Sequence, residues 1–270
     1  MDSGLFAAAN GALRAEMKLE VLGNNLANVN TNGYKQDHIS FASYMTSPGK
    51  EQHPLPNDSF LGTRSPVDIP FPYLNPASNA YRVTYPQAVK TTPDMTDGRL
   101  QNTNNPLDVA ITGEGFFVVE TPQGRRFTRD GAFVTNSAGE LSTRDGHRVL
   151  GEGDAPLVVG EGPVEIAPDG TVASANGVVG RLQRVGAPVE TLAKAGKNLF
   201  DIADRRKEVN LAGTPGGFQQ GFLEGSNMEP VKGMTQMIET NRAFETYMKL
   251  IKSLDGLDEL AANQIGKLQG

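Results

Sequence analysis

Residues 22–35 read Leu-Gly-Asn-Asn-Leu-Ala-Asn-Val-Asn-Thr-Asn-Gly-Tyr-Lys. Glycine and asparagine are poor helix formers, and an asparagine amide is better placed where it can bond free backbone groups. We therefore expect a helix that arrives from the N-terminal side to end between about Asn28 and Gly33. The pair Asn32-Gly33 can supply the left-handed residue with which many helices stop.

The helix before this stop carries apolar residues at steps of three and four, the spacing of a coiled-coil seam. The seam positions are Leu5, Ala8, Ala12, Ala15, Leu19, Leu22, Leu26 and Val29. Phe6, Ala9, Leu13, Met17 and Val21 lie off the seam, so the first turns are apolar nearly all round and must bury more than one side. On spacing alone, an ordinary amphipathic helix with an Asn-rich cap is the alternative.

A second seamed helix is predicted at the other end of the chain. Gly225-Ser226-Asn227 offers a helix start, with Pro230 in the first turn. A helix from about Asn227 to Leu268 would be roughly 60 Å long, which is too long for the small domain beside it. Its predicted contact positions are Met234, Met237, Asn241, Phe244, Met248 and Ile251, then, after a skip of three residues, Leu254, Ala261, Ile265 and Leu268.

Between the helices, from about Val83 to Phe222, the apolar pattern takes a period of two. Turn signals such as Asp145-Gly146 and Asp169-Gly170 separate short strands, which predicts a compact antiparallel β domain. The candidate strands are Arg82–Lys90, Asp108–Ile111, Phe116–Glu120, Arg125–Arg129, Phe133–Thr135, Leu141–Ser142, Val149–Leu150, Val164–Ile166, Thr171–Ala173 and Gly180–Val185.

Proline is concentrated before this domain, because ten of the 17 prolines lie between Pro48 and Pro106. Prolines this close together forbid helix interiors and central strands. The region is predicted to be an extended connector that runs over a surface. A disordered linker is the alternative, although its aromatic and aliphatic residues are numerous for a solvated tether.

These elements give an α+β fold class, with long terminal helices that pair and a β-rich antiparallel middle domain. The predicted divisions are an N-terminal helix at 1–33, an extended proline-rich connector at 34–81, the β domain at 82–222 and a C-terminal helix at 223–270. Apolar helix surface in excess of what one chain can cover indicates pairing with copies in neighbouring molecules.

Composition argues against several classes of function. The net charge is −6, from 25 basic and 31 acidic residues, and no run of lysine or arginine occurs, so neither nucleic acid nor anionic lipid is an expected partner. No apolar run is long enough for a membrane span. Cysteine is absent, which rules out disulfides and thiolate chemistry. The start Met-Asp-Ser-Gly-Leu lacks the positive charge of a secretory signal, so no cleaved signal peptide is expected.

No catalytic, cofactor-binding or metal-binding residues are predicted. The histidines, His38, His53 and His147, fall in three different regions and show no metal-ligand spacing. Asp130 and Asp145 could in principle serve as acid and base, but each precedes glycine in a turn-like context that explains it better. The glycine pairs around Glu114 and Glu152 complete no nucleotide-binding fingerprint.

Four segments resemble the bacterial flagellar rod and hook protein family. They are Asn24–Lys35, Asn105–Phe117, Phe127–Phe133 and Leu223–Asn227, in the order that the family shows. Within the family the chain is most similar to the proximal-rod members. The residues behind that assignment are Lys35-Gln36-Asp37, Pro230-Val231, Arg242–Glu245 and Ile265-Gly266-Lys267.

The resemblance implies a structural subunit that the flagellar type III export apparatus carries out without signal cleavage. Such proteins polymerise helically in the periplasm, with terminal helices lining the tube and the β domain outside, and transmit torque. The implied partners are copies of itself, inner-rod subunits below, distal-rod subunits above and the export apparatus. A distal-rod protein is the alternative within the family, and a surface-binding module such as an adhesin is the alternative outside it.

The predicted subunit-interface residues follow the two seams. They are Leu5, Ala8, Ala12, Ala15, Leu19, Leu22, Asn25, Leu26 and Val29 in the first helix, and Met237, Phe244, Met248, Ile251, Leu254 and Ile265 in the second.

Overall fold

The computed structural model describes residues 2–45, 84–202 and 205–268. The chain forms two compact units. Unit 1 comprises Met1–Ala15, Phe41–Val89 and Ala243–Gly270, and unit 2 comprises Glu16–Ser40 and Lys90–Arg242. Most of the predicted proline-rich connector, residues 46–81, lies outside the described residues.

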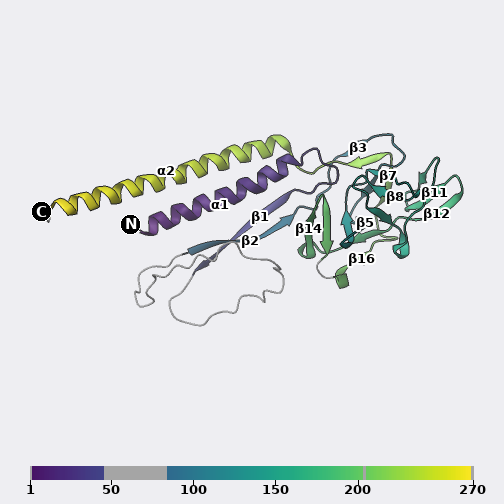
Figure 1. Ribbon diagram of the computed structural model, residues 1–270, viewed down its shortest axis with the longest axis horizontal. Coiled ribbons are helices and arrows are strands. Elements are labelled where there is room, and N and C mark those ends of the chain that lie inside the picture. The colour runs from purple at the N-terminus through teal and green to yellow at the C-terminus, as the bar shows by residue number, and fades with distance from the viewer. Residues whose placement is uncertain (1, 46–83, 203–204, 269–270) are drawn as a thin grey trace. The chain divides into compact units, whose positions relative to one another are not determined.

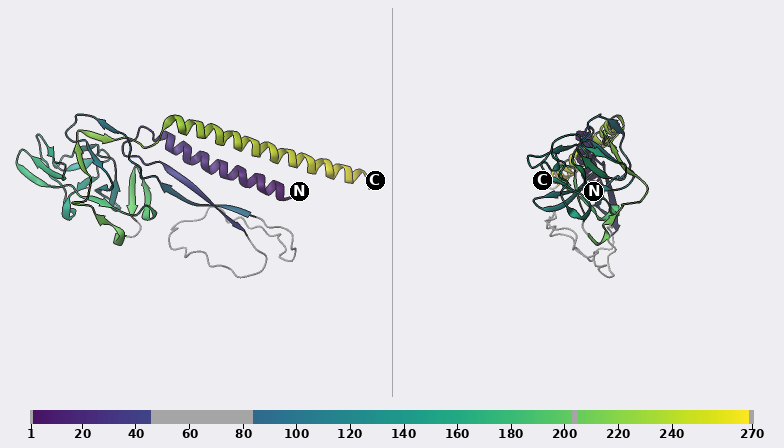
Figure 2. Two further views of the ribbon diagram at one scale, coloured as in Figure 1. Left: turned by 180° about the vertical axis from the view of Figure 1, so that it is seen from behind. Right: turned by 90° about the vertical axis from the view of Figure 1, so that its right-hand side faces the viewer.

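Two long helices frame the sequence, α1 (Asp2–Ala27) and α2 (Pro230–Leu268). They lie side by side and run antiparallel (Figures 1 and 2). In unit 1, Gly11 leaves room for the ring of Tyr247, and in unit 2, Gly23 faces the end of the Met237 side chain. The predicted pairing of the terminal helices is confirmed. Neither helix, over its described residues, combines the length and apolar content needed to cross a bilayer.

The first helix stops at Ala27, just before the range expected from the sequence. Two carbonyls of the last turn, those of Asn24 and Asn25, accept the N–H of Asn28 at 3.2 Å. Gly33 is the left-handed residue, with φ of 64°. A Cβ at this position would overlap the Arg129 carbonyl carbon, so glycine is required both for its conformation and for close packing.

The predicted β-rich middle is confirmed, and its main sheet has nine strands in the part of the chain that the structure describes. The strands are β5 (Phe116–Thr121), β6 (Gly124–Thr128), β7 (Phe133–Thr135), β8 (Leu141–Thr143), β9 (Arg148–Leu150), β13 (Arg184–Gly186), β14 (Leu192–Gly196), β15 (Leu199–Ile202) and β16 (Val209–Asn210). The order β14-β15-β6-β5-β9-β8-β7 forms the main path, and β13 joins β5 to β16.

The other sheets are smaller. One has three strands: β10 (Glu165–Ile166), β11 (Thr171–Ser174) and β12 (Gly177–Arg181). The two-stranded pairs are β4 (Val109–Thr112) with β17 (Gly217–Gln220), β3 (Leu100–Asn102) with β18 (Phe222–Glu224), and β1 (Asp37–Met45) with β2 (Thr84–Pro93). Short 3-10 turns lie at Glu152–Asp154, Val189–Thr191 and Arg205–Lys207.

Strand β5 is buried on both faces because successive side chains of a strand point to opposite sides of the sheet. Phe117 packs on one side, with its ring centroid 4.9 Å from that of Phe133. Phe116 packs on the other side, 5.2 Å from Phe200. Two hydrophobic clusters therefore lie on either side of one central strand.

The strands differ from the sequence prediction in two respects. Residues 180–185 were expected to form one strand, but β12 ends at Arg181 and β13 begins at Arg184 in another sheet. Between them, Leu182 is buried and its N–H bonds the Gly170 carbonyl at 2.8 Å. Residues 37–45, expected in the connector, form β1. The other unexpected strands, β3 and β14 to β18, are short. Such segments form strands because they pair with neighbouring strands, and their own apolar patterns are too short to predict them.

Candidate functional site

The segment after α1 is held by Asn25, which lies in the last turns of the helix and is 2 % exposed. Its Oδ1 accepts the Asp37 N–H at 2.8 Å and the Tyr34 hydroxyl at 2.9 Å. Its Nδ2 donates to the Asp37 carbonyl at 2.9 Å. One amide therefore bonds the backbone of Asp37 in both directions and folds the chain back on α1.

A second asparagine, Asn227, holds the same segment from the start of α2. Its Oδ1 accepts the Gln36 N–H at 2.8 Å, and its Nδ2 donates to the Asp94 carbonyl at 2.9 Å. Asparagines from two motifs far apart in the sequence thus bond neighbouring residues, Gln36 and Asp37. We call this region the junction. It comprises Asn25, Tyr34–Asp37, Asp94–Gly98, Arg129, Glu224 and Asn227, all in unit 2.

The centre of the junction is a buried ionic triad. Lys35 Nζ lies 2.7 Å from Glu224 Oε1, and Arg129 Nη1 lies 3.1 Å from Glu224 Oε2. The three side chains are at most 2 % exposed. Burial lowers the pKa of Lys35, and the negative charge of Glu224 opposes that shift. The triad therefore links three chain segments that meet only in the folded protein.

Backbone groups complete the bonding of the triad. Lys35 Nζ donates to the Thr96 carbonyl at 2.7 Å, and Glu224 Oε1 accepts the Gly98 N–H at 2.9 Å. Arg129 Nη2 donates to the Gly113 carbonyl at 2.6 Å. Buried charges are tolerated when they are paired and their remaining polar atoms are bonded in this way.

Strand β14 also reaches the junction, through Lys194. Its Nζ donates to the Lys35 carbonyl at 2.7 Å and to Asp37 Oδ2 at 2.8 Å, and it lies 4.2 Å from the centre of the Tyr34 ring. Burial lowers the pKa of Lys194 and raises that of Tyr34. The sequence prediction missed Lys194 because nothing nearby in the sequence marks a lone lysine on an edge strand.

Asp94, which directly follows β2, bonds other residues of the junction. Its Oδ1 accepts the Thr96 N–H at 3.0 Å, and its Oδ2 accepts Gln36 Nε2 at 3.0 Å. Burial acts to raise the pKa of Asp94, but these hydrogen bonds outweigh it and lower the pKa to about 2. A carboxylate with a depressed pKa stabilises the folded state above its ordinary pKa of 3.8, and that stabilisation is lost as the pH falls through about 2.

Asp94→Asn is therefore expected to lower the free energy of unfolding at pH 7 by about 1.5–3 kcal/mol, the usual contribution of hydrogen bonds to a charged group. Denaturant titrations of the parent chain and the variant, from pH 7 to pH 2, check this. The difference between the two proteins should shrink between about pH 4 and pH 2 as Asp94 becomes protonated. A difference that stays constant over this range would contradict the role of the charge.

The predicted interface residues of α1 are partly used within the chain. Ala8, Ala12, Ala15, Leu22 and Asn25 are buried, whereas Leu5, Leu19 and Leu26 are half-buried. Val29 is also half-buried but lies beyond the helix, because α1 ends at Ala27. In α2, Met237, Phe244, Ile251 and Leu254 are half-buried, Met248 is exposed, and the side chain of Ile265 lies outside the described residues. Their role as contacts between subunits stays a prediction.

The seam of α2 is continuous to Leu254 and needs no skip. Its less exposed positions recur at steps of four and three: Gly233, Met237, Thr240, Phe244, Tyr247, Ile251 and Leu254. Met234, Asn241 and Met248, which the sequence suggested, each lie one residue beyond this seam and are exposed. The prediction missed Thr240 because threonine reads as polar. Its hydroxyl bonds the Gln236 carbonyl at 2.7 Å, so the residue can lie in an apolar seam.

Large apolar side chains remain exposed on both helices. In unit 1 they are Phe6, Leu13, Met248, Leu250, Leu257 and Leu260, with exposed fractions from 38 % to 61 %. In unit 2 they are Val231, Met234 and Ile238, with exposed fractions from 51 % to 77 %. Large apolar side chains gathered on a protein surface often mark sites of protein association.

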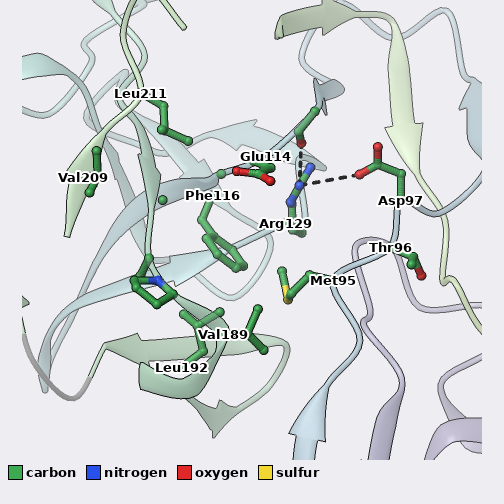
Figure 3. A pocket seen from close by; sticks show the side chains of 15 residues that line it. Met95, Thr96, Asp97, Glu114, Phe116, Arg129, Val189, Leu192, Val209 and Leu211 are labelled. Atoms are coloured by element: carbon green, nitrogen blue, oxygen red, sulfur yellow. Dashed lines mark hydrogen bonds and ion pairs between the residues drawn. The ribbon is translucent and has the colours of Figure 1, made fainter. Parts of the chain in front are cut away.

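A groove of about 610 Å³ opens beside the junction in unit 2. Figure 3 shows Phe116, Met95, Val189 and Leu192 gathered on one side and Asp97 and Glu114 beside Arg129. Arg129 lies 3.7 Å from Asp97, whose side chain is 63 % exposed. The groove therefore offers an apolar wall and two accessible carboxylates.

The structure brings together Asp130, Asp145 and His147, which line one small pocket of about 100 Å³ in unit 2. Asp130 Oδ1 accepts the Ala132 N–H at 3.1 Å, which is the predicted turn role, and burial raises its pKa. Glu114 lies in the connection from β4 to β5 and opens no helix. His53 lies outside the described residues. Within the described residues, no group of three or more histidines and carboxylates is arranged to hold a metal ion.

Comparison with known proteins identifies matches along most of the chain. Residues 5–35 match a family described as flagella basal body rod protein. Residues 110–174 match the flagellar hook protein FlgE/F/G D1 domain, and residues 219–265 match the flagellar basal body rod FlgEFG protein C-terminal region. Lys35, Arg129 and Glu224, the three members of the buried triad, each lie in a different one of these matches.

Individual relatives are similar over their full length. The flagellar basal-body rod protein FlgF of Caulobacter vibrioides is 31 % identical, with 99 % of this chain and 100 % of the relative covered. FlgF of Salmonella typhimurium is 32 % identical, with 98 % of each chain covered. FlgG of Agrobacterium fabrum, another flagellar basal-body rod protein, is 30 % identical, with 96 % of this chain and 97 % of the relative covered.

Proposed function

The chain belongs to the flagellar basal-body rod protein family, and on this basis we propose that it is a FlgF-like structural subunit of the rod. In this proposal the subunits polymerise helically through their terminal helices, and the polymer transmits torque. The family is one of structural proteins, so the role depends on packing between subunits rather than on a reaction. Its members assemble with other rod proteins in the flagellar basal body.

The observation that carries the proposal is the apolar surface left on the helices after they have paired. In unit 1, Phe6 and Leu13 of α1 are 39 % and 42 % exposed, and Leu257 and Leu260 of α2 are 53 % and 61 % exposed. A helix that is apolar on more than one side buries its second side against another helix. Copies of this chain and other rod proteins provide such helices.

The proposal extends to the place and the route of assembly. The position is the proximal rod, between inner-rod subunits below and distal-rod subunits above, in the periplasm. The flagellar type III export apparatus delivers the chain. Support comes from the full-length similarity to proteins named FlgF and from the terminal residues Ile265-Gly266-Lys267. A distal-rod position is the second candidate, favoured by the 30 % identity to FlgG of Agrobacterium fabrum.

Leu13→Glu and Leu257→Glu test the helix surface. Both side chains are substantially exposed in the single chain, so the free energy of unfolding of the monomer should change by no more than about 0.5 kcal/mol. A carboxylate in an apolar contact between helices costs several kcal/mol, so incorporation into basal bodies and motility should be lost. Val178→Glu, at a valine that is 73 % exposed in β12, is the matched control. Normal incorporation of both helix variants would refute the proposal.

The position along the rod needs a separate test. The chain has no natural cysteine, so a cysteine introduced near the C-terminus provides a single crosslinking site. Crosslinks to inner-rod and distal-rod subunits in purified basal bodies are expected for a proximal-rod subunit. Crosslinks to hook subunits and never to inner-rod subunits would support the distal position instead.

A further inference from the structure

The groove beside the junction has the chemistry of a helix-binding site. Its wall is apolar, with Met95, Phe116, Val189 and Leu192 among the fifteen residues that line it. The exposed charged side chains among those residues are Asp97 and Glu114, and both are carboxylates. Arg129 also lines the groove, but it is buried, and it lies 3.1 Å from Glu224 and 3.7 Å from Asp97. A complementary occupant therefore carries apolar side chains next to a cation.

The first turns of α2 carry that combination on their outer surface. Val231, Met234 and Ile238 are 77 %, 51 % and 54 % exposed. Their spacing of i, i+3 and i+7 places them on one side of the helix, away from the buried Gly233 and Thr240. Helices that bind in grooves use anchors at this spacing. Lys232, also exposed, supplies a cation beside Val231.

We propose that the groove binds the first turns of α2 from a second copy of this chain. Val231, Met234 and Ile238 enter the apolar part, and Lys232 lies against Asp97 and Glu114. Val231 and Lys232 are not among the residues that line the groove of their own chain, and Val231 is the most exposed large apolar residue described. Contact with a second copy would bury both the groove of one chain and the exposed first turns of α2 of the other.

The contact is heterologous, because one copy offers a helix and the next offers a groove. A contact of this kind repeats from molecule to molecule and builds a ring or a helical polymer, depending on whether the rotation closes. The inference rests on the proposed function and adds to it a specific subunit contact made by unit 2. The exposed apolar residues of unit 1, such as Leu13 and Leu257, are separate from this contact and can be tested separately.

Cysteine crosslinking tests the contact in cells that build flagella. Two differently tagged full-length copies are expressed together, one with Val231→Cys and the other with Glu114→Cys. Because the natural chain has no cysteine, any disulfide between the tagged copies reports this pair. Mild oxidation should give at least about tenfold more crosslinked dimer than the control pair of Val178→Cys with Glu114→Cys, since Val178 is 73 % exposed and Val231 is 77 % exposed.

A charge exchange then tests the complementarity. Lys232→Glu and Glu114→Lys each place like charges in contact, which should reduce incorporation into basal bodies by about tenfold. The two substitutions present together in every copy restore opposite charges and should bring incorporation back to within about threefold of the parent chain. Both positions are exposed, so unchanged thermal unfolding of each variant confirms that folding is intact.

The outcomes separate this inference from the proposed function. Basal bodies that contain the chain but give no Val231–Glu114 crosslink above the control would overturn the contact and leave the rod function standing. A crosslink from position 231 to a different rod protein instead of a second copy would also overturn it, as would a charge exchange that fails to rescue two defective single variants. A chain absent from basal bodies would contradict the proposed function itself, and the contact with it.

Discussion

Glu224→Gln is expected to lower the free energy of unfolding of the full-length monomer by about 3–5 kcal/mol. The substitution keeps the shape of the side chain but removes its charge, so Lys35 loses its buried partner and Arg129 keeps only the exposed Asp97, 3.7 Å away. Domains of this size are stable by about 5–15 kcal/mol, so a loss of this magnitude places much of the protein near unfolding. Denaturant titration of the purified chain measures it.

Two comparisons show whether the loss belongs to the buried triad. Asp97→Asn removes a carboxylate 3.7 Å from Arg129 whose side chain is 63 % exposed, and an exposed pair is worth about 0–1 kcal/mol. Lys35→Met combined with Glu224→Gln leaves one buried cation instead of two. The double variant should therefore be less destabilised than the sum of the single variants by about 1–2 kcal/mol. Strictly additive losses would show that the triad does not act as a unit.

The sequence predicted the elements of this fold better than the connections between them. Steps of three and four residues located both terminal helices, and a period of two located the β domain, because these patterns are local. The triad is not local, since 189 residues separate Lys35 from Glu224. A signal was present nonetheless: Lys35, Arg129 and Glu224 each lie inside a different one of the motifs that indicated the family.

The helix seam shows a second limit of the sequence pattern. Counting apolar residues in α2 selected Met234 and Met248, which are exposed, and passed over Thr240 and Tyr247, which lie in the seam with Phe244. Both choices follow from α2 having apolar residues on two sides. When a helix has one apolar face, the sequence pattern identifies the face that packs within the chain. When a helix has two apolar faces, the pattern alone does not show which of them packs within the chain.

These two limits have a common physical origin. Asn25 and Asn227 bond the backbone of Asp37 and Gln36, so residues from both ends of the chain hold the segment after α1. The motifs at the two ends of the chain therefore specify one structure together.

Gly33→Ala is expected to lower the free energy of unfolding by about 2–5 kcal/mol. Gly33 has φ of 64°, which costs an L-residue about 1–2 kcal/mol. A Cβ there would also overlap the Arg129 carbonyl carbon, and overpacking of this kind adds about 1–3 kcal/mol. The backbone at Gly33 cannot easily shift away from Arg129, because the Gly33 N–H bonds the Glu224 carbonyl at 2.7 Å. Denaturant titration of the purified variant measures the loss.

Gly146→Ala is the matched control for the contact. Gly146 has φ of 85°, but no atom lies within 4 Å of an added Cβ, so only the conformational cost of about 1–2 kcal/mol applies. The difference between the two variants isolates the contact of residue 33 with Arg129. Equal losses at both positions would mean that the segment after α1 moves away from Arg129 without cost, and the junction would then not fix the path of the chain between α1 and β1.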